Sequence, residues 1–268
     1  MRDFLGITRT SETTWRFHVA DRLITPGKFL FGGCALAAGV VALEEASSRP
    51  TIYAAAHYLS FAPLDTEVDV VVDLAVVGRR VTQARASAVT DGREVVTINA
   101  ALGTGELSSP TPWLVMPLVP APEDCPERHM PARYETSIFS HVETRIALGR
   151  RYEEMDGTAG SPISALWVRV PHHLEPSAAT LAIFGDFVAG GASQPLGRHA
   201  MGRSLDNTIR VATLAPTEWV LVEIHMHALS GGFSQATAHL WSRSGVLLGT
   251  ASQSMSTVLW DPPASEDA

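Results

Sequence analysis

The chain has 268 residues, of which 46% are hydrophobic and 18% charged, so it can bury a large core and is not expected to be disordered. Its 28 acidic and 20 basic residues give a net charge of −8, and basic residues do not cluster with aromatic ones, which argues against nucleic-acid binding as the main function. The first fifteen residues lack the apolar core of a signal peptide, so we expect a cytoplasmic protein with its two cysteines reduced.

The first half of the chain predicts one buried helix followed by antiparallel strands. Residues 29–47 have little polar character until their end, which is typical of a buried helix, and their apolar run is too short for a membrane span. In residues 67–76, valines alternate with acidic residues, which indicates a half-buried strand. Residues 78–102 contain two further strands joined at Asp91-Gly92, a strong signal for a hairpin turn.

A proline-rich segment separates the two halves. Seven prolines lie between positions 110 and 131, which is incompatible with a helix or a central strand and predicts an extended connection. We therefore expect an N-terminal domain over 1–109, a linker over 110–131 and a C-terminal domain over 132–268.

The second half repeats the order of the first. A Gly/Ala-rich helical segment at 181–191 precedes strands at 203–211 and 218–228, and then a hairpin at 231–255 with its turn at Ser244-Gly245. Gly33 and Gly185 are 152 residues apart, as are Gln83 and Gln235, whereas Gly92 and Gly245 are 153 apart. Such internal repetition predicts two copies of one α+β unit, an antiparallel sheet around a long central helix.

Asp186 is the one charged residue in the apolar segment LAIFGDFVAGG. A buried carboxylate is costly unless it is paired or hydrogen-bonded, so its presence needs a cause. At the repeat spacing, Cys34 corresponds to Asp186 and Ala100 to Gln253. The first half therefore lacks both polar groups, which predicts an asymmetric molecule with its site in the second half.

Five segments carry a resemblance to a known family: FLFGGCALAAGV, the hairpin of residues 79–103, SLDNTIRV, EWVLVEI and SGVLLGTASQSM. In order and spacing they resemble the acyl-CoA thioesterase II family, from about residue 29 to about residue 258. The resemblance implies a double hotdog fold and, in fatty acid metabolism, hydrolysis of acyl-CoA to a free acid and CoA. It implies no metal and no other cofactor, and it favours a homo-oligomer.

The same resemblance implies the site residues. The family positions its attacking water with an Asp, a Thr or Ser, and a Gln, which fall here on Asp186, Ser204 and Gln253. Backbone N–H groups at a helix start are a natural source of oxyanion donors, so Gly33, Cys34 and Gly185 are candidates for oxyanion or substrate binding. Cys34 and Asn207 depart from the family, which often has glutamine and histidine there.

Other interpretations of these residues remain open. Asp186 and Ser204 also suit helix caps or turns, and Gln253 suits a solvated strand face. His225 and His227 are two apart on a predicted strand, as metal ligands sometimes are, but no acidic or cysteine partner at a convincing spacing accompanies them. The alternative functions are an enoyl-CoA hydratase or dehydratase and a non-catalytic acyl-ligand-binding protein. The sequence determines neither the acyl-chain length nor whether the carrier is CoA.

Overall fold

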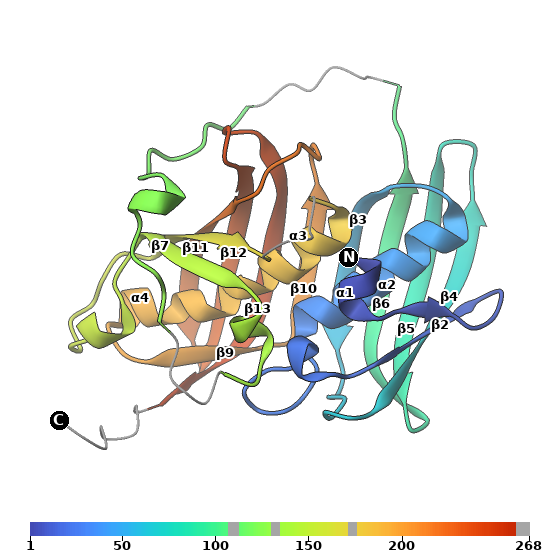
Figure 1. Cartoon of the computed structure of the whole chain (residues 1–268), viewed down its shortest axis with the longest axis horizontal. Coiled ribbons are helices and arrows are strands. Elements are labelled where there is room, and N and C mark those ends of the chain that lie inside the picture. The colour runs from blue at the N-terminus through green and yellow to red at the C-terminus, as the bar shows by residue number, and fades with distance from the viewer. Residues whose placement is uncertain (107–112, 130–134, 171–175, 261–268) are drawn as a thin grey trace.

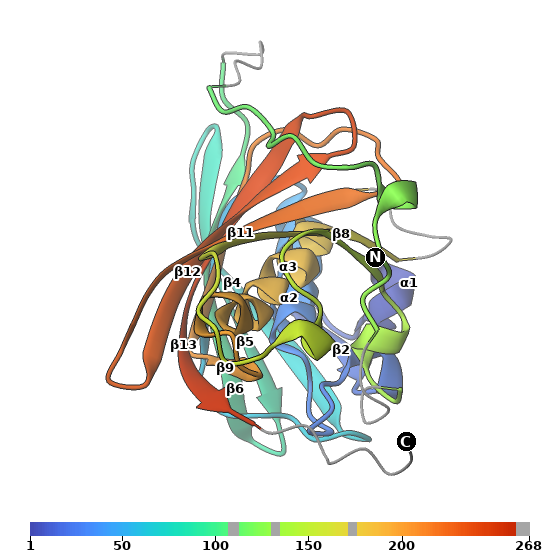
Figure 2. The ribbon, with the colours of Figure 1, turned by 90° about the vertical axis from the view of Figure 1, so that its left-hand side faces the viewer.

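The computed structural model describes residues 1–106, 113–129, 135–170 and 176–260. Its strands form one 13-stranded sheet that curves around the helices (Figures 1 and 2). The sheet order is β1-β2-β4-β5-β6-β3-β10-β13-β12-β11-β8-β7, and β9 pairs with β13 outside this path. All pairs are antiparallel.

Each half supplies its own set of elements. The N-terminal half contains α1 (Arg2–Leu5), β1 (Thr8–Arg9), β2 (Thr14–His18), η1 (Asp21–Leu23), α2 (Gly32–Ser47), β3 (Thr51–Tyr58), β4 (Glu67–Val77), β5 (Val81–Thr90) and β6 (Arg93–Gly103). After it come η2 (Pro122–Asp124), η4 (Ile138–Ser140), β7 (Glu143–Leu148), η5 (Tyr152–Glu154), β8 (Ile163–Arg169), α3 (Ala178–Gly185), η6 (Asp186–Ala192), α4 (Ser193–Leu196), β9 (Ala200–Ser204), β10 (Asp206–Val211), β11 (Val220–Ser230), β12 (Phe233–Ser242) and β13 (Leu247–Leu259).

The predicted buried helix, alternating strand and hairpin of the first half are confirmed. Helix α2 buries nearly all of its length against the sheet, and the alternate valines of β4 face the core. The turn between β5 and β6 has both Asp91 and Gly92 at positive φ, 49° and 72°, as a two-residue hairpin with the right-handed strand twist requires.

The two halves meet at the central strands β3 and β10. Thr208 pairs with Ala55, and a twofold axis through this pair relates the flanking pairs Asn207–Ala56 and Ile209–Ala54. This register gives the molecule a local twofold relation, with the N-terminal half on the right of Figure 1 and the C-terminal half on the left. The result is the double hotdog fold that the sequence predicted, with α2 and α3 enclosed by one continuous sheet (Figure 2).

The packing of two helix glycines corrects the predicted alignment of the repeats. A Cβ on Gly39 would meet Ile98 of β6, and a Cβ on Gly185 would meet Ala251 of β13 at 2.8 Å. Ile98 and Ala251 are equivalent strand positions, 153 residues apart, so Gly185 corresponds to Gly39 and not to Gly33.

It follows that Asp186 corresponds to Val40, which is fully buried, rather than to Cys34. Gly39 and Gly185 are 146 residues apart, and so are the first residues of the two helices, Gly32 and Ala178. The C-terminal half therefore has about seven extra residues between its helix and β10, in the region that contains β9. The equivalence of Gly33 with Gly185 was therefore wrong. The sequence suggested it because both segments are rich in glycine and alanine and can be aligned in more than one way.

The described part of the predicted linker, residues 113–129, runs over the outer face of the C-terminal sheet; residues 110–112 and 130–131 lie outside the description. It contains the short 3-10 turn η2 and no strand or α-helix. Cys125 packs against Trp167 and Trp241, and the Trp167 indole N–H donates to the carbonyl of Pro120 at 2.9 Å.

Cys125 and Cys34 are both buried free thiols. No helix in the described ranges has the length and apolarity needed to span a bilayer.

Candidate active site

Asp186 lies where the second core helix changes its geometry. Ser177 is the N-cap of α3: its hydroxyl accepts from the backbone N–H of Thr180, and the helix ends at Gly185. From Asp186 the chain continues as the 3-10 segment η6. The predicted helical segment is therefore α-helical only up to Gly185, and the tighter 3-10 turns of η6 continue it. This break places the Asp186 side chain against the first half.

Three donors from three separate elements converge on the Asp186 carboxylate. The backbone N–H of Gly33, at the start of α2, donates to Oδ2 at 2.7 Å. The Ser204 hydroxyl, at the end of β9, donates to Oδ1 at 3.3 Å, and the Gln253 amide on β13 donates to the same oxygen. The structure thus brings Asp186, Ser204 and Gln253 together, although they are far apart in the sequence.

Burial dominates the electrostatics of this carboxylate. Asp186 is 3% exposed, and burial raises its pKa from the ordinary value of 3.8 to about 6. The bonds from Gly33, Gln253 and Ser204 favour the ionised form and limit that rise. The start of α2 also presents the positive end of a helix dipole to the carboxylate. At neutral pH the group is ionised, yet it is a stronger base than an exposed aspartate.

The three candidate oxyanion residues have other roles in this structure. The Gly33 N–H is occupied by Asp186, and the Cys34 N–H donates to the carbonyl of Phe31 at 3.0 Å. Gly185 is the last residue of α3 and directly precedes η6, so it does not lie at the start of an α-helix. Burial and the nearby charge of Asp186 raise the pKa of the Cys34 thiol well above its ordinary value, which keeps it protonated and a poor nucleophile.

Two more polar residues of the site, Tyr58 and Asn207, were not predicted as functional. Asn207 is fully buried on β10, and the hydroxyl of Tyr58 on β3 is buried as well. In the sequence, Asn207 stood out only as a departure from the family. Tyr58 follows Ala54 and Ala56 at the alternate spacing of an inward-facing strand position, which was the one signal available for it.

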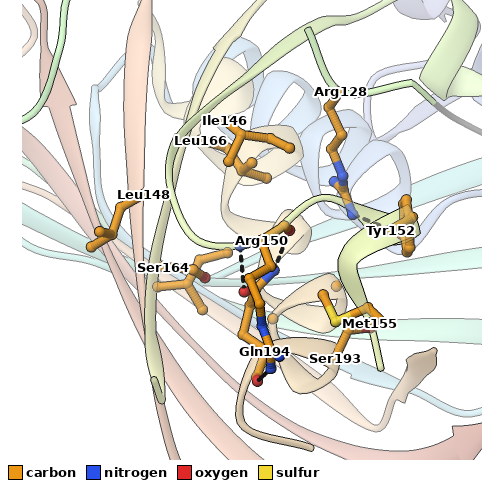
Figure 3. Close-up of a pocket in the computed structure, with 13 residues that line it drawn as sticks. Arg128, Ile146, Leu148, Arg150, Tyr152, Met155, Ser164, Leu166, Ser193 and Gln194 are labelled. Carbon is orange, nitrogen blue, oxygen red and sulfur yellow. Dashed lines mark hydrogen bonds between the residues drawn. The ribbon is translucent and has the colours of Figure 1, made fainter. Parts of the chain in front are cut away.

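A narrow pocket lies beside the end of the same 3-10 segment, where Gly190 and Gly191 line it (Figure 3). It lies between η6 and the strands β7, β8 and β11, and Ile146, Leu166 and Ile224 form part of its apolar wall. On another side, the Arg128 guanidinium donates to the Tyr152 hydroxyl at 2.8 Å. The pocket therefore combines an apolar wall with cationic residues.

The outer face of β11 and β12 carries a second polar cluster. Glu223, His225 and His239 offer three possible ligand atoms within 4.8 Å of one another, so His225 has an acidic neighbour that the strand spacing did not reveal. The Glu223 carboxylate already accepts from the Trp241 indole at 2.9 Å and lies 2.9 Å from His225 Nε2. The carboxylate is thus satisfied by its neighbours. His227 contacts Thr237 instead, so the two histidines considered as a pair do not share a ligand site.

Burial disfavours the charged form of Glu223, yet its pKa lies below the ordinary value. The reason is that the bonds from Trp241 and His225 outweigh the effect of burial.

Comparison with known proteins identifies both halves of the chain. A family model described as the acyl-CoA thioesterase C-terminal domain matches residues 122–257, and the corresponding N-terminal domain model matches residues 20–103. No curated protein matches the chain.

Solved structures similar to this one cover nearly the whole chain. A thioesterase from Novosphingobium aromaticivorans, itself assigned only provisionally, is 29% identical over 93% of this chain and 97% of its own, with a TM-score of 0.83. A hot dog fold protein of unknown function from Alicyclobacillus acidocaldarius is 19% identical over 97% of this chain and 98% of its own, with a TM-score of 0.84. The tesB protein of Mycobacterium avium subs paratuberculosis is 16% identical over 96% of this chain and 97% of its own, with a TM-score of 0.78.

Proposed function

The chain belongs to the acyl-CoA thioesterase family, and on that premise we propose that it hydrolyses an acyl-CoA to a free carboxylic acid and CoA. The observation that carries the proposal is the convergence of Gly33, Ser204 and Gln253 on one buried carboxylate with a pKa of about 6. A carboxylate in this state is suited to remove a proton from water at neutral pH.

In the proposed reaction, water attacks the thioester directly. Asp186 accepts one proton of the water while the water oxygen forms a bond to the carbonyl carbon. The tetrahedral intermediate then collapses, the C–S bond breaks, and the proton held by Asp186 passes to the CoA sulfur. The products are the carboxylic acid and the CoA thiol, so atoms and charge balance without a covalent acyl-enzyme.

Ser204 and Gln253 orient the attacking water in this scheme. The Ser204 hydroxyl donates to Oδ1 of Asp186, so it acts on the water by fixing the orientation of the carboxylate that accepts one of its hydrogens. The Oε1 atom of Gln253 is buried and has no hydrogen-bond partner within the described chain, so it is available to accept the second hydrogen of the water. Fixing both hydrogens directs a lone pair of the water toward the carbonyl carbon.

The apolar pocket of Figure 3 is the proposed place for the acyl chain. It lies beside the end of η6, at Gly190 and Gly191, and its wall of Ile146, Leu166 and Ile224 suits a hydrocarbon. The CoA portion then extends toward the surface. Chain length is the property that this pocket would control.

The test is release of CoA thiol from acyl-CoA substrates of increasing chain length, detected with a thiol reagent. We expect release by the unmodified protein, and a loss of at least about 1,000-fold in kcat for Asp186→Asn and Asp186→Ala with the fold intact by circular dichroism. The exposed aspartate variant Asp73→Asn is the matched control. Unchanged turnover in Asp186→Asn would exclude this mechanism. Hydration of an enoyl-CoA without thiol release would indicate a hydratase, and binding without turnover a binding protein.

A further inference from the structure

Four unpartnered polar atoms occur together beside Asp186. Among the described residues, nine buried side-chain polar atoms have no hydrogen-bond partner, and four of them are Tyr58 Oη, Asn207 Oδ1, Asn207 Nδ2 and Gln253 Oε1. A buried polar atom without a hydrogen bond is destabilising. Such a concentration of unmade bonds at one place is expected where a ligand completes them.

The sheet register explains why these three residues form one group. Asn207 lies opposite Ala56 of β3 on one side. On its other side the pairing of Thr208 with Ser252 places Asn207 opposite Gln253 of β13. Tyr58 is two residues beyond Ala56 on β3, on the same face, and is the diagonal neighbour of Asn207. Tyr58, Asn207 and Gln253 therefore form a polar row across three adjacent strands.

The tyrosine end of this row lies close to the proposed base. The point where a Cβ on Gly32 would lie is 2.9 Å from the Tyr58 hydroxyl and 3.0 Å from Asp186 Oδ2, so these two oxygens are less than 6 Å apart. Tyr58 and Asp186 therefore face the same narrow space beside Gly32. A side chain at position 32 would fill the space between the two groups, which accounts for the glycine there.

The proposed reaction needs donors for the carbonyl oxygen, which gains negative charge as water attacks. The Gly33 and Cys34 N–H groups are already bonded, to Asp186 and to Phe31. The buried donors at this place that make no hydrogen bond of full geometry are the Tyr58 hydroxyl and the Asn207 amide, which lie close enough to interact with each other. On the basis of the proposed thioesterase function, we infer that Tyr58 and Asn207 bind the thioester carbonyl oxygen and stabilise the oxyanion.

Tyr58 is suited to this role because it stays protonated. Burial and the nearby charge of Asp186 raise the pKa of Tyr58 well above the ordinary value, and the interaction with Asn207 limits that rise, so at neutral pH the hydroxyl carries a hydrogen to donate. The hydrogen bond strengthens as the carbonyl oxygen becomes an oxyanion, and no proton needs to be transferred. Tyr58 comes from the N-terminal half, whereas the base comes from the C-terminal half, so the complete site requires both.

The first experiment compares Tyr58→Phe and Asn207→Ala with matched controls. Asn207→Ala introduces the residue that the first half carries at the equivalent position, Ala54. The controls are Tyr53→Phe, on the outer face of β3, and Asn99→Ala, which is exposed on β6. For Tyr58→Phe we expect a fall in kcat of about 100- to 1,000-fold, with little change in KM. Asn207→Ala is expected to act in the same direction, and both controls to behave like the unmodified protein.

A spectroscopic measurement separates carbonyl binding from a structural effect. An acyl-CoA labelled with ¹³C at the thioester carbonyl is bound to Asp186→Asn, which holds it without turnover, and the infrared carbonyl band is recorded. We expect a shift to lower wavenumber on binding that is lost in the double variant Asp186→Asn, Tyr58→Phe. An equal shift in both variants would overturn the assignment of Tyr58.

The outcomes distinguish this inference from the function on which it rests. If the unmodified protein releases no thiol from any acyl-CoA, both fail. If it releases thiol, Asp186→Asn is inactive and Tyr58→Phe is fully active, the carbonyl-binding role alone is wrong and the proposed function stands.

Discussion

The two halves share a scaffold but differ at each position that faces the proposed base. Where the C-terminal half has Asp186, the N-terminal half has Val40; Gln253 corresponds to Ala100. Likewise, Asn207 corresponds to Ala54. The first half thus fills its core with apolar side chains, and the second half places polar ones there. The fold accommodates both sets of side chains, which supports the proposal that the polar residues of the second half serve the reaction.

The difference extends to the backbone of the core helices. Helix α2 runs unbroken from Gly32 to Ser47, whereas α3 ends at Gly185 and continues as η6 and α4. Helix α2 has no side-chain cap of its own, and Asp186 accepts the N–H of Gly33 in its place. The C-terminal half thus supplies the proposed base, and the N-terminal half supplies a backbone donor that binds its carboxylate.

Among these variants, Gln253→Ala is expected to lower activity most. It introduces the residue that the first half has at the equivalent position, Ala100. The variant removes one donor to Asp186 and the unpartnered acceptor Oε1. We expect kcat to fall by about 100- to 1,000-fold, because the water loses its orientation and the base loses a bond. The assay is thiol release, with the exposed glutamine variant Gln235→Ala as control. A fall of less than about threefold would mean that Gln253 only packs the core.

The second prediction concerns the effect of ionised Asp186 on the free energy of unfolding. Asp186 has a pKa of 3.8 when exposed and about 6 when folded, so the folded state binds the proton more tightly. Its favourable contribution is complete below pH 3.8 and is lost as the pH rises through about 6. Relative to Asp186→Asn, the unmodified protein should lose roughly 3 kcal/mol of unfolding free energy between these limits.

Urea unfolding of both proteins between pH 4 and pH 8 measures this difference. In Asp186→Asn the Gln253 amide can turn and offer its free Oε1 to the new Nδ2, so the substitution leaves the packing intact. Parallel stability curves for the two proteins across this range would show that the pKa of Asp186 is not raised.

The third prediction is the pH dependence of the reaction itself. Only the ionised form of Asp186 accepts a proton, and its pKa is about 6. We expect kcat/KM to be nearly constant above pH 7 and to fall about tenfold for each pH unit well below 6. Thiol release in a series of buffers at constant ionic strength measures the profile. A midpoint near pH 4 would mean that the carboxylate is exposed in the active protein. Asp186 would then not be buried as its counterpart Val40 is, and its pKa would not be raised.

Some of this comparison was predictable from the sequence, and the reasons are local. The strands and hairpins follow from alternation and from turns such as Asp91-Gly92, which depend on neighbouring residues alone. Asp186 was conspicuous because a charge in an apolar segment is rare. By contrast, the helix equivalence failed because glycine and alanine carry little positional information. Tyr58 was missed because its place beside Asn207 depends on the pairing of β3 with β10, which links residues about 150 positions apart.

The smallest effect is expected from Ser204, which lies in the region where the C-terminal half has extra residues. Its bond to Oδ1 is 3.3 Å long, against 2.7 Å for the bond from Gly33, and its side chain is only partly buried. A hydrogen bond of this kind contributes about 0.5–1.5 kcal/mol, so Ser204→Ala should lower kcat by about 3- to 10-fold. Ser204→Thr should retain activity because it keeps the hydroxyl, and Ser252→Ala on the other face of β13 is the control. A loss as large as that of Gln253→Ala would show that the added region positions the water as strongly as the sheet does. The asymmetry between the halves would then come from the extra residues as much as from the replaced side chains.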